Sequence, residues 1–343
     1  MNNDIDVTKF KIGVVGAGSW GTALANLLAL KGFIIDFWVF EEEVKHQIEK
    51  YGENRIFLPG FSLSKNIRPT NDISKAVSDK DLVLVVVPSH VMRETAKKIS
   101  GKISAHTIIV SASKGIENKT HLTMSGVLKE TLRDIAQNRF AVISGPSFAR
   151  EVVKEVPTLV VVASNDKSTA VTVQHIFATP HFRVYTNDDI IGVEMDGAVK
   201  NVIAIAAGIS DGFGLGLNTR AALITRGLAE IKRLGLKLGA NPHTFAGLAG
   251  AGDLILTCTG TLSRNHTVGF KIGRGEKIKD ILAEMRMVAE GVKTARSVYN
   301  LSRRLEVEMP ISHETYHILY DDFSPKESMY RLMTRDLKHE LDT

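Results

Sequence analysis

The stretch that decides the fold is "KIGVVGAGSWGTALANLLALKG", residues 11–32. It begins with an apolar run rich in β-branched residues, turns at closely spaced glycines and continues into an Ala- and Leu-rich segment that ends at Gly32. A short β-branched run favours a buried strand, and the segment after it favours a helix. The stretch therefore predicts a strand, a tight turn and a helix, which is the opening unit of an α/β sheet.

The turn itself predicts a ligand. Gly16, Gly18 and Gly21 follow the G-x-G-x-x-G spacing, in which the first glycine permits the tight turn, the second lets the backbone approach a pyrophosphate and the third lets helix and strand pack closely. The phosphate would then meet free N–H groups at the helix N-terminus. An ordinary glycine turn is the alternative. The strand-turn-helix context, and Glu41 about twenty positions further on, favour a dinucleotide site.

The end of the second apolar run indicates which dinucleotide binds. Glu41, Glu42 and Glu43 follow it directly, and their charges would repel a 2′-phosphate, so NAD(H) is favoured while NADP(H) stays possible. Phe40 is placed to lie on the adenine face. The alternative is that Phe40 is a core residue at the strand end and the three glutamates are a solvated helix start.

The strand-helix rhythm continues through the first half of the chain and then stops at Asp188. The predicted strands are 11–15, 33–40, 81–87, 106–113, 140–144, 158–164 and 182–186. The predicted helices of the second half are 189–210, 219–235, 242–250, 277–284, 290–304, 311–322 and 325–339. These patterns predict an α/β fold: a Rossmann domain with a doubly wound, mostly parallel sheet over 1–188, followed by an all-α domain over 189–343.

Composition limits the classes of protein. The 43 basic and 38 acidic residues are mixed in sign along the chain, so no nucleic-acid groove is expected. The beginning carries no apolar signal region and no run suits a membrane span, and a single cysteine, Cys258, fits a reducing compartment. The histidines lack metal-ligand spacing, so we expect no metal. A cytoplasmic enzyme with a small-molecule substrate is the expectation.

One charge interrupts the apolar stretch "GAVKNVIAIAAG", residues 197–208. Helical spacing places Lys200 on one face with Gly197, Asn201 and Ala204, where small neighbours would leave room for a ligand. An apolar setting lowers a lysine pKa from its usual ~10.4 toward operating pH. Hydride transfer at a carbinol carbon needs such a proton donor and acceptor. The alternative is a lysine whose ammonium reaches solvent.

Further polar residues follow predicted strands or glycine turns. Parallel sheets bind ligands at the carboxyl ends of their strands, which applies to Lys114, Gly145 and Ser147. The second half adds Asp253 after a glycine-rich turn and the triplet Ser263, Arg264 and Asn265. The planar fork of an arginine suits phosphate. Singly, Asp253 and Ser147 could be helix caps and Arg264 a surface charge. Together they indicate an anionic, hydroxylated substrate.

Eight segments carry a resemblance to a known family: "GVVGAGSWGTALA", "VVVPSHV", "SASKGIE", "VISGPSFA", "GAVKNVIAIAAG", "ALITRGLAE", "GAGDLILTC" and "SRNHTVG". In this order they resemble the NAD(P)-dependent glycerol-3-phosphate dehydrogenases of the soluble bacterial type, over most of the chain. The resemblance implies an oxidoreductase that interconverts dihydroxyacetone phosphate and sn-glycerol 3-phosphate and supplies glycerophospholipid synthesis. It also implies a Rossmann domain and a helical domain, and we expect a homodimer.

The resemblance also implies roles for individual residues. Lys200 would exchange the proton at the C2 oxygen, with Lys114 and Asp253 beside the substrate. Arg264 would bind the substrate phosphate together with Ser263 and Asn265, and the substrate pocket would include Gly145, Ser147 and Asn201. The implied cofactor contacts are Ser19, Trp20, Ala149, Val288 and Glu290, with Lys114 and Arg264 near the cofactor as well. In one respect the chain departs from many bacterial members, because "WVFEEE" is closer to the NAD-preferring eukaryotic relatives.

Two other functions fit the same residues. In a related dehydrogenase acting on a carboxylate, Arg264 would hold a carboxylate in place of a phosphate. In a catalytically silent dinucleotide sensor, the proton donor would be lost. Lys200 is present, and we therefore expect an enzyme.

Overall fold

The structure is a computed structural model that describes residues 9–285 and 287–340, and the chain forms two compact units. The sheet unit runs to Ser113 and resumes over Met124–Ile190, and the helical unit comprises Lys114–Thr123 and the chain from Ile191 onward. The sequence predicts two continuous domains, 1–188 and 189–343. The structure differs from this, because Lys114–Thr123 lies within the first range but belongs to the helical unit. The physical cause of this difference is a contact with helix α13, Glu290–Arg304: the Ser297 hydroxyl donates to the Ile116 carbonyl, at 2.9 Å, and lies 3.0 Å from the Asn118 side-chain oxygen.

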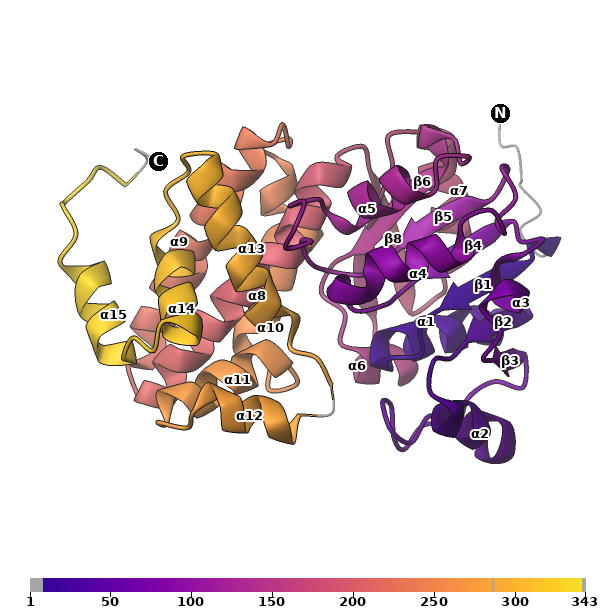
Figure 1. The fold of residues 1–343 in the computed structure, drawn as a ribbon, viewed down its shortest axis with the longest axis horizontal. Coiled ribbons are helices and arrows are strands. Elements are labelled where there is room, and N and C mark those ends of the chain that lie inside the picture. The colour runs from indigo at the N-terminus through magenta and orange to yellow at the C-terminus, as the bar shows by residue number, and fades with distance from the viewer. Residues whose placement is uncertain (1–8, 286, 341–343) are drawn as a thin grey trace. The chain divides into compact units, whose positions relative to one another are not determined.

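The sheet unit is built on an eight-stranded sheet in the order β3-β2-β1-β4-β5-β6-β7-β8 (Figure 1). The strands are β1 Ile12–Val15, β2 Ile35–Trp38, β3 Ile67–Thr70, β4 Leu82–Val85, β5 Ile108–Ser111, β6 Phe140–Ser144, β7 Thr158–Ala163 and β8 Phe182–Asn187. All neighbours pair in parallel except β6 with β7. The order of the first six strands is that of a dinucleotide-binding Rossmann sheet.

The seven predicted strands are confirmed, and an eighth, β3, escaped the sequence analysis. Its residues, "IRPT", contain a proline and one buried apolar side chain, Ile67. Proline is confined to sheet edges because it cannot donate a ladder hydrogen bond, and β3 is an edge strand. A short edge strand of mixed polarity leaves no periodic pattern from which to predict it.

Helices connect the strands of the sheet unit. They are α1 Ser19–Leu30, α2 Glu42–Tyr51, α3 Ile73–Val77, α4 Met92–Ile99, α5 Met124–Thr131, α6 Ala149–Val153 and α7 Lys167–Phe177. The core between sheet and helices is made of aliphatic strand residues such as Val14 and Leu84, together with α1 residues such as Leu24 and Leu28. Strands buried on both faces read as continuous apolar runs, which is why most of them were predictable.

The helical unit is arranged around one long buried helix, α8 Ile190–Phe213, in which every residue from 192 to 205 is buried. The other helices are α9 Gly216–Lys237, α10 Asp253–Thr259, α11 Arg264–Gly273, α12 Ile278–Glu284, α13 Glu290–Arg304, α14 Pro310–Tyr320 and α15 Pro325–Met333. The predicted fold class, a doubly wound sheet followed by a helical part, is confirmed. Among the described residues, no helix is long and apolar enough to span a membrane.

Two predictions for the helical unit are wrong. The expected helix 242–250 is a 3-10 turn, Thr244–Ala246, followed by a π-helical turn, Leu248–Gly252. Three glycines over 247–252 disfavour α-helix there. Helices α10 and α11 were not predicted. Helix α10, "DLILTCT", is short and contains three β-branched residues, and the α11 residues "RNHTVGFKIG" include two glycines and few periodic apolar positions.

Candidate functional site

The glycine turn of the sheet unit combines two kinds of glycine. At Gly16 the backbone is left-handed, with φ +113°, and an added Cβ would lie 2.3 Å from the Val86 carbonyl oxygen; at Gly21 it would lie 2.0 Å from the Gly16 carbonyl oxygen. Gly18 differs, since nothing lies within 4 Å of an added Cβ. Gly16 and Gly21 are therefore required by the fold, whereas Gly18 faces open space in which a ligand could approach the backbone.

The first turn of α1 suits a phosphate group. Gly18 is its N-cap and supplies no side-chain hydrogen bond, and the first turn contains no acidic residue, so the helix N-terminus keeps its partial positive charge. Ser19 is half-buried. The indole Nε1 of Trp20 is buried and has no hydrogen-bond partner in the described part of the chain. A buried unpaired donor is costly without a ligand, and these groups therefore fit a pyrophosphate-containing cofactor.

The residues after β2 are exposed. Phe40 is 69% exposed and contacts Trp38 edge-on, with 6.1 Å between ring centroids. The alternative of a core phenylalanine is therefore wrong. Glu41 is the N-cap of α2, and Glu42 and Glu43 lie in its first turn, where they complement the helix dipole. Both an adenine-binding face and a ribose-binding carboxylate remain predictions here.

A third segment of the sheet unit follows β6. Gly145 has φ +139°, and an added Cβ would lie 3.0 Å from the Val160 Cα. The Ser147 hydroxyl donates to the Gly145 carbonyl at 2.9 Å, and Ala149 is the first residue of α6. Ser147 stabilises this turn and is not a helix cap, because the N-cap of α6 is Phe148.

In the helical unit, Lys200 is 5% exposed, so the alternative of a lysine that reaches solvent is wrong. Its Nζ donates to Asp253 Oδ1 at 2.5 Å and to Thr257 Oγ1 at 2.6 Å. Lys114 approaches the same carboxylate from the other side, with its Nζ 2.5 Å from Asp253 Oδ2. A single carboxylate thus joins two ammonium groups from separate parts of the chain. We call Lys114, Lys200, Asp253 and Thr257 the lysine cluster.

The lysine cluster shifts the acidity of Lys200. Burial penalises its ammonium and, with repulsion from Lys114, lowers the Lys200 pKa to about 8, against the opposing attraction of Asp253. The geometry depends on the glycine turn before α10, where a Cβ on Gly250 would lie 2.2 Å from the Phe245 carbonyl oxygen. That turn delivers Asp253 as the first residue of α10, so Asp253 is not a helix cap.

Thr257 is a site residue that the sequence analysis missed. It lies one turn after Asp253 on α10, and its hydroxyl donates to the Asp253 carbonyl at 2.6 Å while accepting from Lys200. The spacing of four residues after Asp253 could have indicated it. The expected free space beside Ala204 is absent, because Ala204 is fully buried in the core of the helical unit. The ligand side of Lys200 therefore does not extend along α8 toward Ala204.

The triplet at the start of α11 is ordered by hydrogen bonds. Ser263 is the N-cap and accepts from the His266 backbone N–H at 3.2 Å. Asn265 donates to Asn201 Oδ1 at 2.8 Å and accepts from the Gly291 N–H at 3.0 Å. Asn201, the neighbour of Lys200, is thereby linked to α11. Arg264 is exposed, and one arm of its guanidinium donates to the Val288 carbonyl at 2.8 Å, just before Glu290 begins α13. Two predicted cofactor residues thus adjoin the triplet.

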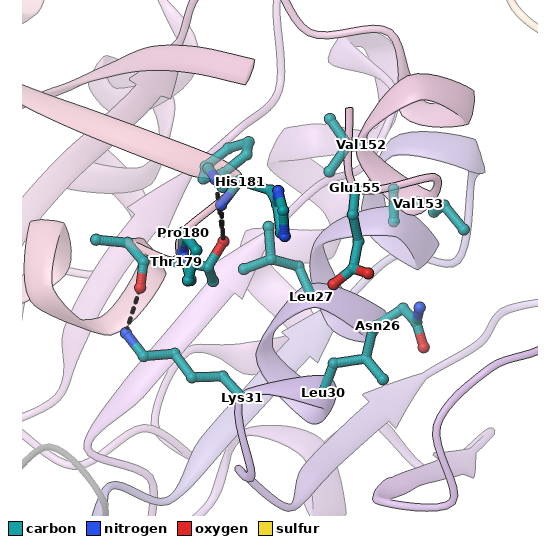
Figure 2. Close-up of a pocket in the computed structure, with 13 residues that line it drawn as sticks. Asn26, Leu27, Leu30, Lys31, Val152, Val153, Glu155, Thr179, Pro180 and His181 are labelled. Carbon is teal, nitrogen blue, oxygen red and sulfur yellow. Dashed lines mark hydrogen bonds between the residues drawn. The ribbon is translucent and has the colours of Figure 1, made fainter. Parts of the chain in front are cut away.

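A cavity of about 220 Å³ lies elsewhere, within the sheet unit. Figure 2 shows Leu27 of α1, Lys31 directly after α1, Glu155 after α6 and His181 around it. Lys31 donates to the Ala178 carbonyl at 2.7 Å, which occupies its ammonium. None of the predicted site residues lines this cavity. Over the described residues, no cluster of His, Cys, Asp and Glu could hold a metal ion.

A Rossmann sheet with an open glycine turn and a buried lysine held by a carboxylate define a class of protein, the nicotinamide-dependent dehydrogenases. Comparisons with known proteins specify the family. Residues 11–170 and 189–330 match the N- and C-terminal regions of NAD-dependent glycerol-3-phosphate dehydrogenase. The chain belongs to this family.

Individual relatives of this chain carry the name of the same family. The chain is 56% identical over 331 residues to a glycerol-3-phosphate dehydrogenase named for NAD(P)+ from Syntrophobacter fumaroxidans, covering 96% of this chain and 97% of that protein. It is 56% identical over 330 residues to the enzyme of that name from Geobacter sulfurreducens, with 96% and 98% coverage. The crystal structure of a glycerol-3-phosphate dehydrogenase from Coxiella burnetii superposes with a TM-score of 0.92 at 38% identity, covering 96% of this chain and all of that one.

Proposed function

We propose that this protein catalyses the reversible, NAD(P)H-dependent reduction of dihydroxyacetone phosphate to sn-glycerol 3-phosphate, and so supplies glycerophospholipid synthesis. Family membership supports the reaction. The observation that carries the mechanism is the burial of Lys200 between Asp253 and Thr257. A lysine desolvated in this way is suited to proton transfer near neutral pH, which an exposed lysine is not.

Lys200 is the general acid of the reduction. When hydride reaches C2 of the ketone, negative charge develops on the carbonyl oxygen, and Lys200 donates its proton there. A pKa of about 8 keeps Lys200 largely protonated at neutral pH while making the proton easier to release. Asp253 holds the ammonium in place and favours its charged form, whereas Lys114 favours the neutral form. In the reverse direction neutral Lys200 takes the hydroxyl proton.

The glycine turn holds the cofactor. A nicotinamide dinucleotide bound there supplies or accepts the hydride. Gly16, Gly18 and Gly21 bring the backbone amides at the start of α1 to the pyrophosphate, beside Ser19 and Trp20. Phe40 would flank the adenine, and Glu41 would accept hydrogen bonds from the ribose hydroxyls. Because Glu42 and Glu43 add negative charge, NAD(H) is favoured and NADP(H) is possible. The further cofactor contacts are Lys114, Ala149, Arg264, Val288 and Glu290.

The start of α11 binds the substrate phosphate. The guanidinium of Arg264 offers a planar fork of donors for it, and its exposure keeps that fork accessible. Ser263 and Asn265 hold the turn in shape through the hydrogen bonds described above. We assign the remaining substrate contacts to Gly145, Ser147 and Asn201. Phosphate binding energy then orients a small ketone for reaction.

The two parts of the chain divide these tasks. Most of the proposed dinucleotide contacts come from residues 1–188 and most of the proposed substrate contacts from residues 189–343. The exceptions are Gly145 and Ser147 for the substrate, Arg264, Val288 and Glu290 for the cofactor, and Lys114, which lies in the first range but belongs to the helical unit. We further propose a homodimer formed through helices of the second half, which is supported by the exposed apolar side chains of Phe213 and Leu217, 44% and 73% exposed. A cytoplasmic location fits the single free cysteine, Cys258. Sedimentation analysis of the purified protein tests the dimer.

The decisive test of the activity is a substrate and cofactor comparison. Oxidation of NADH is followed with dihydroxyacetone phosphate, with unphosphorylated dihydroxyacetone and with a panel of 2-keto acids, and reduction of NAD+ is followed with a panel of 3-hydroxy acids. Each assay is repeated with NADPH or NADP+. We expect turnover with dihydroxyacetone phosphate to exceed that of every other compound. A preference for a carboxylate substrate would overturn the assignment of the phosphate site. If neither NADH nor NADPH is oxidised, the proposed dehydrogenase activity is overturned.

A further inference from the structure

Helices α8 and α11 touch through their backbones. An added Cβ on Gly208 would lie 2.1 Å from the His266 carbonyl oxygen, and one on Gly212 would lie 2.2 Å from that of Phe270. The reverse holds for Gly269 and Gly273 of α11, where an added Cβ would lie 2.1 Å from the Ile205 and 2.3 Å from the Ile209 carbonyl oxygen. Glycine permits such close approach.

This contact fixes the separation of the two helices but not the rotation of α11 about its own axis. The glycine pairs set the separation between α8, which carries Lys200, and α11, which begins at Arg264. They provide no interlocking side chains, which normally fix how far one helix is rotated or slid against its neighbour. The Asn265–Asn201 hydrogen bond ties the start of α11 to α8 at one point, and a further interaction is needed to fix the rotation of α11 and with it the direction of Arg264.

Asp211 supplies that interaction. It lies about three turns after Lys200 on nearly the same face of α8, and its side chain is 8% exposed. Asp211 Oδ2 lies 2.6 Å from Nε2 of His266, in the first turn of α11. Arg220 of α9 binds the same carboxylate through both oxygens, with Nε 2.9 Å from Oδ1 and Nη2 2.8 Å from Oδ2. Such bidentate pairs are strong and directional.

His266 links the phosphate-binding turn to α8. Its ring is held by Asp211, and its backbone N–H donates to the hydroxyl of Ser263, the N-cap of α11. We propose that Asp211 and His266 are positioning residues for the substrate phosphate: their contact sets the rotation of α11 and thereby aims Arg264 relative to Lys200. This inference rests on the proposed function. It adds two residues and a helix contact that neither the motif spacing nor the family resemblance assigned.

The test compares a phosphorylated with an unphosphorylated substrate. In His266→Ala, KM for dihydroxyacetone phosphate should rise about tenfold, because a misdirected Arg264 loses about one charge-assisted hydrogen bond to the phosphate, and the inhibition constant of inorganic phosphate should rise in parallel. The kcat/KM for dihydroxyacetone, which lacks the phosphate, should not change. His266→Gln places an amide N–H where the ring nitrogen lay and should restore most of the affinity for dihydroxyacetone phosphate.

A control variant separates positioning from general loss of structure. Lys271 is also on α11 but pairs with Glu284 and Glu276 at the protein surface, so Lys271→Ala should leave both substrates unaffected. Equal losses with both substrates in His266→Ala, or a loss that His266→Gln does not restore, would show that His266 is merely structural. If Arg264→Ala leaves KM unchanged, the proposed phosphate site fails. If Arg264→Ala raises KM and His266→Ala does not, only this inference fails.

Discussion

The glycine turn and the lysine cluster use the chain in opposite ways. In the turn the groups that fit a ligand are mostly backbone amides, and what matters about Gly16, Gly18 and Gly21 is the side chain they lack. In the cluster the working groups are side-chain ends, Lys200 and Lys114, that meet on Asp253. The first site is compact in sequence. The second joins residues separated by as many as 139 positions.

This difference decides what each region can do chemically. Backbone dipoles attract an anion but have no proton to exchange near neutral pH, so the turn is suited to binding. The lysine cluster places an ionisable group in an environment that shifts its pKa, so it is suited to proton transfer. Variants of the cluster should therefore change turnover, and variants of the turn should change cofactor affinity.

The largest effect is expected at Lys200. Lys200→Met keeps the length of the side chain and removes the ammonium, and kcat should fall by about 10²- to 10⁴-fold because the general acid is lost. Binding of NADH, followed by its fluorescence, should be unchanged. Steady-state kinetics of both directions checks the first expectation, with Lys271→Ala as the matched surface control. A kcat close to that of the unmodified protein would remove Lys200 from the mechanism.

Arg264 should show a smaller effect of a different kind. In Arg264→Ala, KM for dihydroxyacetone phosphate should rise about 10- to 100-fold, since charge-assisted hydrogen bonds to the phosphate are lost, while kcat changes less. The comparison is with Arg274→Ala, because Arg274 follows the same helix, is exposed and lies over the Phe270 ring. Equal KM values for the two variants would contradict the phosphate role.

Two glycine variants separate folding from binding within the turn. Gly16→Ala combines a left-handed backbone with a clash against the Val86 carbonyl and should lower the free energy of unfolding by about 1–3 kcal/mol. Gly18→Ala has φ −64° and open space, so the fold should be unaffected while KM for NADH rises about tenfold, because the Cβ keeps a pyrophosphate away. Chemical denaturation and cofactor kinetics measure the two effects. Normal NADH affinity in Gly18→Ala would contradict the predicted cofactor site.

Glu41 is the charged side chain of this region to which we assign a binding role, and its effect should be the smallest. Glu41→Ser removes the charge that opposes a 2′-phosphate, so kcat/KM with NADPH should rise several-fold relative to NADH, on the scale of one surface charge interaction. Glu49→Ser, further along α2, is the control. An unmodified protein that already prefers NADPH strongly would show that Glu41 does not select the cofactor.

The sequence predicted the sheet better than the helical unit for a physical reason. A strand buried on both faces is apolar along its whole length, and most of the strands are of this kind. Helices packed through glycines lack the usual apolar stripe, so α11 was missed, and the glycine-rich segment 242–250 was wrongly predicted to be a helix. The transfer of Lys114–Thr123 to the helical unit depends on Ser297, which no local pattern reveals.

The residues of the candidate site were likewise predictable only in part. Spacing alone identified the glycine turn, and one charge in an apolar helix drew attention to Lys200. That Lys114 and Lys200 share Asp253, and that Thr257 and Asp211 take part, follows from distances between helices that periodicity does not encode. Local patterns specify which residues are unusual, and tertiary contacts specify which of them meet.

The pH dependence of kcat/KM tests the central claim most directly, namely that Lys200 is the proton donor and that Asp253 raises its pKa. For the reduction, kcat/KM of the unmodified protein should be constant at low pH and fall as pH rises through about 8, because the reaction needs protonated Lys200. For the oxidation, which needs neutral Lys200, kcat/KM should instead rise as pH increases through about 8. In Asp253→Asn the carboxylate that favours the Lys200 ammonium is gone, so the fall in kcat/KM for the reduction should occur at lower pH. If kcat/KM of Asp253→Asn falls at the same pH as in the unmodified protein, or at a higher pH, the account is contradicted.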